Sequence, residues 1–119
     1  MTYLNKGKNM KDPFYRGINN ENLNFKLVNF EQAMNIKKSD STAIVLDVRT
    51  PEEFNEGHLH DAVLIPYDEI EKYAPNALPD KTVPILIYCR AGRRSLIAAN
   101  TLINLGYSNI YEFGGHTLW

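Results

Sequence analysis

The only cysteine in the chain, Cys89, lies in the segment YCRAGRRS, between a run of apolar residues and a helical pattern. Backbone N–H groups and a helix N-terminus would point at its sulfur, an arrangement that binds anions. Three arginines add positive charge within five residues: Arg90, Arg93 and Arg94. Such surroundings stabilise a thiolate, so Cys89 is expected to be a nucleophile at neutral pH. The alternative is a buried structural cysteine beside a solvated basic turn.

A second group of polar residues follows another apolar run. The segment 43–48 is β-branched and almost continuously apolar, as expected of a parallel strand covered on both faces. Ligands bind beyond the carboxyl ends of such strands, so Asp47 and Arg49 are expected at the same sheet edge as Cys89. We expect Asp47 to organise the turn after its strand. Arg49 either contributes to anion binding or forms a structural salt bridge, for example with Glu53.

Strand and helix patterns alternate along the chain. Strands are expected over 25–28, 43–48, 62–66, 85–88 and 109–113. Helices are expected after Asn29, with Gln32 completing a capping box, over 51–57 after Thr50, over 68–73 with a stop at Pro75, and over 95–105 with a stop at Gly106. This alternation predicts an α/β fold, a mainly parallel sheet with helices on both faces. Residues 1–24 are expected to form an irregular arm before one domain over 25–119.

Composition excludes several classes of protein. The chain has 119 residues, enough for one domain, and 13 basic against 14 acidic residues give a net charge of −1. That balance argues against nucleic acid or a membrane surface as the partner. A single cysteine excludes an internal disulfide and a cysteine-rich zinc site. Without an apolar membrane span or a secretory signal, the expected compartment is the cytoplasm, where a free thiol survives.

Four motifs together carry a resemblance to a known family. They are LDVRTPEEF from Leu46, GHLHDAVLIP from Gly57, the loop CRAGRRS, and GG with a downstream tryptophan. In this combination the chain resembles the single-domain rhodanese family over about 25–119. Two positions depart from the family pattern: Asp61 stands where a glycine is usual, and the chain stops at Trp119, where members generally continue.

The resemblance implies a five-stranded parallel sheet and a sulfurtransferase without a cofactor. In the family reaction Cys89 would take a sulfane sulfur from a small anionic donor, thiosulfate or a persulfide, and pass it to cyanide, a thiol or a protein acceptor. The loop residues would cradle the terminal sulfur and attract the donor: Cys89, Arg90, Ala91, Gly92, Arg93 and Arg94. Arg49 would lie near this site.

The remaining polar residues are expected to have structural roles. The resemblance places His58 in a structural motif, and a cycle that starts from a thiolate needs no strong base, although histidine is the usual proton shuttle. Ser95 is expected to cap the helix, with a hydrogen bond to the Cys89 sulfur as the other possibility. His60 and His116 have no partner set, so no metal site is expected.

Two other functions remain open. Related phosphatases and arsenate reductases use a seven-residue loop as an oxyanion cradle, whereas Arg94 follows Cys89 by only five positions and the seventh residue is Ser95. The shorter cradle favours a sulfur atom over a tetrahedral phosphate. The third possibility is a sulfur-carrier or partner-docking module with little turnover of its own, although the intact Cys89 argues against an inactive domain.

Overall fold

The computed structural model describes residues 24–115. The N-terminal arm expected over 1–24 lies outside the described residues apart from Asn24, and so do His116 and Trp119. None of the helices within 24–115 is both long and apolar enough to cross a membrane.

Five parallel strands form one sheet in the order β1-β5-β4-β2-β3. Their bounds are β1 (Lys26–Leu27), β2 (Ile44–Asp47), β3 (Val63–Leu64), β4 (Ile85–Cys89) and β5 (Ile110–Gly115). The central strand β4 is buried along its whole length, between β2 and β5. The predicted α/β fold is therefore confirmed, and each expected strand is present. Because β4 is central, Cys89 lies in the middle of the carboxyl edge of the sheet.

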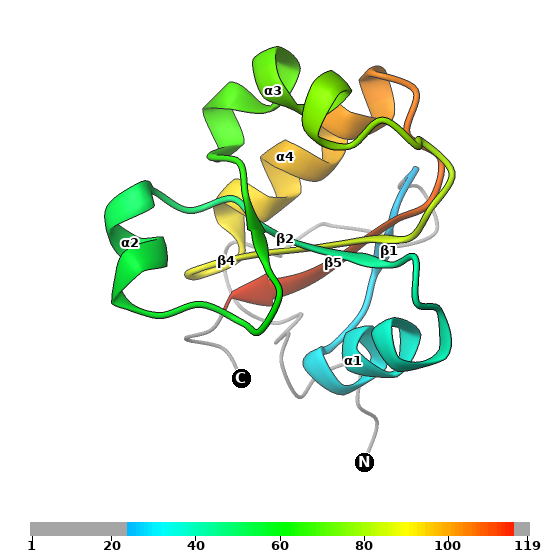
Figure 1. Cartoon of the computed structure of the whole chain (residues 1–119), viewed down its shortest axis with the longest axis horizontal. Coiled ribbons are helices and arrows are strands. Elements are labelled where there is room, and N and C mark those ends of the chain that lie inside the picture. The colour runs from blue at the N-terminus through cyan, green and yellow to red at the C-terminus, as the bar shows by residue number, and fades with distance from the viewer. Residues whose placement is uncertain (1–23, 116–119) are drawn as a thin grey trace.

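Helices cover both faces of the sheet (Figure 1). On one face lie α3 (Ile70–Ala77) and α4 (Arg93–Asn104), on the other lies α1 (Phe30–Ser39), and the short α2 (Pro51–Glu56) follows β2. The core is divided accordingly, because side chains alternate along β4. Ile87 and Cys89 belong to the cluster beneath α3 and α4, whereas Leu86 and Tyr88 belong to the cluster beneath α1. The sulfur of Cys89 thus lies on the α4 side.

Two capping boxes begin the helices that flank β2. Asn29 accepts the Gln32 N–H at 2.8 Å, and the Gln32 side chain accepts the Asn29 N–H at 3.0 Å. Thr50 and Glu53 make the same reciprocal pair before α2, with Pro51 in the first helical position. The Asn29 box and the helix start after Thr50 were expected from the sequence, whereas the part played by Glu53 was not. Both boxes satisfy N–H groups that the first helical turn leaves unpaired.

The expected stop at Pro75 is wrong, because α3 continues to Ala77. Proline removes one backbone hydrogen bond inside a helix and crowds the preceding turn. Burial outweighs this cost, since Ala74 and Leu78 are in the core on either side of Pro75. The Tyr107 hydroxyl also donates to the carbonyl oxygens of Ala74, at 3.0 Å, and Leu78, at 2.6 Å.

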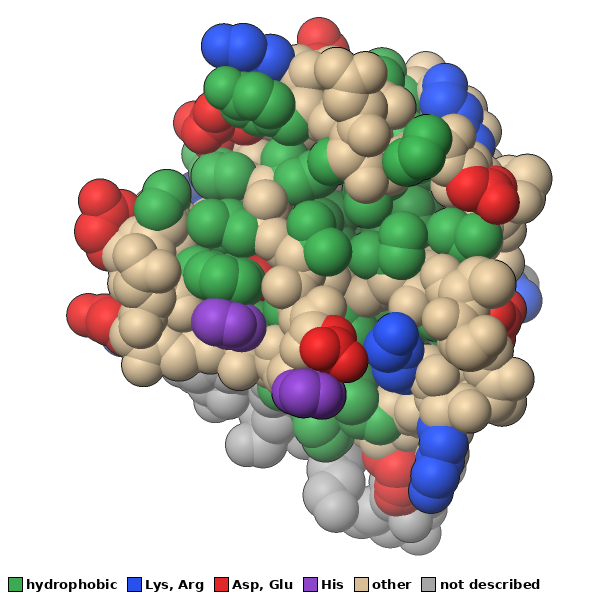
Figure 2. All heavy atoms as spheres, viewed as in Figure 1, with side chains coloured by type: hydrophobic (Ala, Val, Ile, Leu, Met, Phe, Trp, Pro, Cys, Tyr) green, Lys and Arg blue, Asp and Glu red, His purple; other side chains and the backbone are tan. Residues whose placement is uncertain are grey.

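Asp61 adopts a backbone conformation that usually needs glycine. Its φ is +62°, in the left-handed region where aspartate and asparagine are tolerated better than other side chains. The turn that carries Asp61 in place of the usual glycine therefore keeps a glycine-like shape. It leads into β3, a two-residue edge strand on the face where apolar side chains gather in Figure 2. Such a short edge offers little backbone for pairing with another chain.

Candidate active site

The Cys89 side chain ends β4 in a buried position, 1% exposed. The backbone N–H of Gly92 donates to its sulfur at 2.9 Å. Gly92 makes this possible by adopting φ +101°, which lets the chain turn back over the sulfur before α4 begins. One N–H of the expected cradle thus contacts the sulfur, and an N–H donor at this distance stabilises a thiolate.

The expected role of Ser95 as helix cap is wrong. Gly92 is the N-cap residue and makes no side-chain cap, because α4 begins two residues earlier than the pattern indicated. Ser95 lies in the first turn with its side chain fully buried. Its Oγ is 3.4 Å from the Cys89 sulfur and donates toward the Gly92 carbonyl at 3.0 Å. The second possibility, contact with the sulfur, is the one the structure shows.

A buried glutamate that the sequence reasoning missed completes this cluster. Glu112 on β5 is fully buried and its Oε2 accepts a hydrogen bond from the Ser95 hydroxyl. The same oxygen accepts the Gly114 N–H at 3.0 Å. Strand alternation could have found it, because Glu112 lies two residues after the core residue Ile110 and must face the same side.

The end of β5 closes against the loop at a glycine. A Cβ atom built on Gly115 would lie 2.1 Å from the Arg90 carbonyl oxygen and 2.4 Å from the Ala91 nitrogen. Any larger residue would therefore push the loop away from the sheet. Residue pairing also shifts here: Ile87 opposes Glu112, but Cys89 opposes Gly115, so β5 carries one extra residue.

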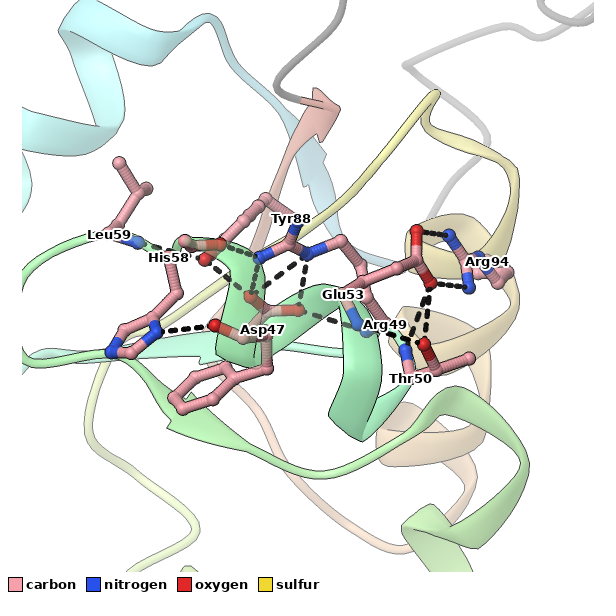
Figure 3. Close-up of polar contacts among 10 residues, drawn as sticks. Asp47, Arg49, Thr50, Glu53, His58, Leu59, Tyr88 and Arg94 are labelled. Atoms are coloured by element: carbon pink, nitrogen blue, oxygen red, sulfur yellow. Dashed lines mark hydrogen bonds and ion pairs between the residues drawn. The ribbon is translucent and has the colours of Figure 1, made fainter.

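The three arginines of the loop have different surroundings. Arg90 and Arg93 are exposed, whereas Arg94 is held by Glu53 through hydrogen bonds of 2.7 and 2.9 Å (Figure 3). The hydrogen bonds from Arg94 lower the pKa of Glu53 to about 2, and they raise the pKa of the guanidinium. Arg94, in the first turn of α4, thus ties that helix to α2.

The salt bridge suggested between Arg49 and Glu53 is wrong, because Arg49 pairs with Asp47. Its Nη2 lies 2.7 Å from the Asp47 Oδ2, and both side chains are buried. Asp47 also accepts the Arg49 backbone N–H at 2.9 Å, which is the turn-organising contact expected of it. Arg49 pairs with Asp47 because the turn already aligns this acid, two residues away, with the guanidinium. The Glu53 carboxylate is instead hydrogen-bonded to Arg94.

Tyr88 ties this pair to the neighbouring loop. Its hydroxyl donates to Asp47 at 2.5 Å and accepts the Leu59 N–H at 3.1 Å. Burial, followed by the hydrogen bond to Asp47, raises the pKa of the Tyr88 phenol. The hydrogen bond to Asp47 raises the pKa of Arg49 as well. The network therefore fixes the segment beside the site.

The His58 side chain packs against α2 rather than lying at the Cys89 sulfur. Its Nδ1 lies 2.8 Å from the Phe54 carbonyl oxygen, and its ring stacks on that of Phe54 at 3.6 Å between centroids. The adjacent Gly57 carbonyl accepts a hydrogen bond from Arg49 at 2.6 Å. A cavity of about 390 Å³ opens here, with Arg49, His58 and Arg90 in its wall. It adjoins the loop on the Tyr88 side of the sheet.

This geometry defines a class of protein: a parallel α/β domain that places a cysteine, followed by a loop with three arginines, at the carboxyl edge of its sheet. The family comparison is specific, since a model described as the rhodanese-like domain matches residues 29–119. The chain belongs to the rhodanese family and is a thiosulfate sulfurtransferase-like enzyme.

Curated relatives support that assignment across most of their length. The chain is 37% identical over 70 residues to the thiosulfate sulfurtransferase PspE of Escherichia coli, covering 59% of this chain and 67% of the relative. It is 34% identical over 96 residues to the thiosulfate sulfurtransferase GlpE of Pseudomonas putida, covering 80% and 84% respectively.

Solved structures share the fold. A structure titled as a rhodanese with anions from E. coli superposes with a TM-score of 0.61 at 34% identity, covering 65% of this chain and 91% of that one. The human single-domain sulfurtransferase TSTD1 gives a TM-score of 0.65 at 26% identity, covering 75% and 88%.

Proposed function

We propose that this enzyme carries a sulfane sulfur on Cys89 as a persulfide. The observation that carries the proposal is the Gly92 N–H on the Cys89 sulfur at 2.9 Å, at the head of α4. A thiolate there needs no separate base at the moment of attack, because the surrounding donors and charges already stabilise it. Membership of the rhodanese family supports the same chemistry.

The transfer of sulfur to Cys89 and its transfer onward to an acceptor both balance in atoms and electrons without a cofactor. The Cys89 thiolate attacks the outer sulfur of thiosulfate, a Cys–S–S⁻ bond forms, the S–S bond of thiosulfate breaks, and sulfite leaves with the electron pair. An acceptor thiolate, or cyanide, then attacks the outer sulfur of the persulfide. The Cys89 thiolate leaves and is ready for another cycle. Because the loop accepts a negative sulfur in both states, it supports both half-reactions.

The loop residues divide the work of binding. The backbone N–H of Gly92 donates to the reacting sulfur, and the exposed Arg90 and Arg93 attract the anionic donor. Arg94, fixed by Glu53, adds a stationary positive charge close to Cys89, whose thiolate form contributes to raising the pKa of Arg94. The loop therefore combines exposed charges for capture with a fixed N–H donor for the transferred sulfur.

Residues around the loop shape the site rather than touch the sulfur. Asp47 and Arg49 hold the turn after β2, and His58 holds the end of α2. The acceptor in this proposal is a small thiol or a protein thiol. Since the reacting cysteine must stay reduced, the chemistry suits a reducing compartment such as the cytoplasm.

A steady-state assay tests the proposal. The enzyme is given thiosulfate and cyanide, and thiocyanate is measured for wild type, Cys89→Ser and Glu71→Gln. Glu71 is an exposed residue of α3, so its substitution controls for handling and expression. We expect turnover in wild type and the control and none in Cys89→Ser. Full turnover by Cys89→Ser would contradict the proposal, as would an enzyme that hydrolyses a phosphate ester through Cys89 without forming thiocyanate.

A further inference from the structure

One arginine beside the reacting cysteine is already bound to a carboxylate of another helix. Nη1 and Nη2 of Arg94 donate to the two oxygens of Glu53 at 2.7 and 2.9 Å (Figure 3). The side chains are 25% and 17% exposed, so the pair is partly shielded from water. Hydrogen bonding to Glu53, and to a smaller extent the charge of Cys89, raise the pKa of Arg94. The guanidinium is therefore within electrostatic range of the sulfur, while both its terminal nitrogens are bonded to α2.

The Glu53 carboxylate is itself held in place. Its Oε1 accepts hydrogen bonds from the Thr50 backbone N–H and from the Thr50 hydroxyl, each at 3.1 Å. These contacts belong to the capping box that begins α2. Glu53 cannot follow Arg94 toward a ligand in the loop without breaking this cap. The pair is therefore a fixed part of the site, unlike an exposed ion pair between two flexible side chains.

Two kinds of anion would make different demands on Arg94. A sulfur carried on Cys89 is stabilised by nearby positive charge and by the Gly92 N–H, which lies 2.9 Å from the cysteine sulfur. A tetrahedral oxyanion such as phosphate is held best by parallel N–H donors, which the fork of an arginine side chain supplies. The paired guanidinium still acts on sulfur through its charge. Its terminal fork reaches an oxyanion only if Glu53 is displaced.

We propose that Glu53 is a positioning residue that makes the loop selective: by holding the Arg94 fork, it weakens the binding of tetrahedral oxyanions such as phosphate and leaves the loop open to sulfur donors. Thiosulfate reacts through its outer sulfur, so its oxygens need only the guidance of exposed charges such as Arg93. Phosphate has no such sulfur and must be held by its oxygens. This selectivity rests on the proposed function in taking the Cys89 loop as the site of sulfur binding.

The test is an NMR titration with inorganic phosphate at constant ionic strength, with chloride as the balancing anion. The Kd is taken from the Gly92 N–H signal. Glu53→Gln removes the carboxylate charge but keeps a carbonyl oxygen that can accept the Thr50 N–H, so α2 keeps its cap. We expect phosphate to bind this variant about tenfold more tightly than wild type, the gain from one charge-assisted hydrogen bond.

Glu56→Gln is the matched control. Glu56 is an exposed acid at the end of the same helix, and it also borders the cavity beside the loop. Its substitution removes the same charge without releasing an arginine, so the phosphate Kd should change less than about threefold, as for a single exposed charge. A gain in Glu53→Gln no larger than the gain in Glu56→Gln overturns the proposal, because loss of charge alone would explain it.

A double variant, Glu53→Gln with Arg94→Gln, identifies the group that is released. Both members of the pair are then neutral, and phosphate should bind within about threefold of wild type. A tenfold gain that persists in the double variant overturns the proposal, because Arg94 is then not the group that binds phosphate. A tenfold loss also overturns it, because Arg94 would already bind phosphate while it is paired in wild type.

One measurement uses wild type alone and does not depend on the folding of any variant. The side-chain N–H signals of Arg94 should keep their positions as phosphate is added, and movement as large as that of the Gly92 N–H signal overturns the proposal. The two hypotheses fail separately, because phosphate binding does not require sulfur transfer. Tighter phosphate binding by Glu53→Gln in a protein that takes no sulfur from thiosulfate contradicts the mechanism alone. Sulfur loading without that gain contradicts the selectivity alone.

Discussion

The Arg94 guanidinium meets the Glu53 carboxylate through two parallel hydrogen bonds, from Nη1 to Oε1 at 2.7 Å and from Nη2 to Oε2 at 2.9 Å (Figure 3). Glu53 also accepts the Thr50 N–H at 3.1 Å, so one carboxylate both caps α2 and anchors the loop arginine. Bidentate pairs of this kind fix geometry as well as adding energy. The first turn of α4 is thereby tied to α2.

Glu53→Gln should destabilise the fold by about 1–2 kcal/mol at pH 7, because it removes charge-assisted hydrogen bonds that are partly buried. Arg94 lowers the folded-state pKa of Glu53 from 4.5 to about 2. A lowered pKa gives stability that is fully present above pH 4.5 and is lost as pH falls toward 2. Urea unfolding should therefore show the difference from wild type shrinking between pH 5 and 2. A difference that is the same at both pH values would contradict the pairing.

Tyr88→Phe should cost about 1–2 kcal/mol, since it deprives the buried Asp47 of a hydrogen bond and leaves the Leu59 N–H without its acceptor. The matched control is Tyr73→Phe, because Tyr73 is 45% exposed. The measurement is the melting temperature of each variant in thermal unfolding. Equal melting temperatures would show that the network around Asp47 contributes nothing to stability.

Gly115→Ala should abolish sulfur loading on Cys89, because the new Cβ would meet the Arg90 carbonyl oxygen at 2.1 Å and displace the loop. Gly106→Ala is the contrast. Its φ of +97° strains an alanine, but the contacts of a Cβ there are ordinary, 3.7 Å or more. We expect it to lose about 1 kcal/mol of stability while loading sulfur normally. Normal loading in Gly115→Ala would refute the tight closure.

Arg93→Gln should raise the KM for thiosulfate about threefold at low salt, the value of one exposed charge interaction, with kcat nearly unchanged. The effect should fade as salt is added, because screening removes the attraction of an exposed charge. Lys72→Gln, an exposed cation on α3, is the control. A loss of kcat at unchanged KM would instead place Arg93 at the reacting sulfur.

Local patterns predicted the fold well. Each strand, the Asn29–Gln32 capping box and the start of α2 after Thr50 follow from short-range rules, apolar runs and residue types at the helix start, and these do not depend on distant contacts. The position of Cys89 at the end of a buried strand followed in the same way. Pro75 did not, because its place within α3 depends on packing of Ala74 and Leu78 and on the distant Tyr107.

The finer arrangement of the site depends on partners far apart in sequence. Arg94 and Glu53 are 41 residues apart, and Ser95 and Glu112 are 17 apart, so neither pairing follows from local spacing. Ser95 was misplaced because the glycine at 92 lets α4 begin before the apolar stripe does. One feature of the sequence could have indicated Glu112: it is an acid at an inward-facing position of a strand, and a buried acid requires a hydrogen-bonding partner.

The central claim is that Cys89 takes up a single sulfur atom. Its most direct measurement is the intact mass of the protein after incubation with thiosulfate, followed by addition of cyanide. We expect a gain of one sulfur on wild type, removed by cyanide as thiocyanate, and no gain on Cys89→Ser. An unchanged wild-type mass, or an equal gain on Cys89→Ser, would contradict it.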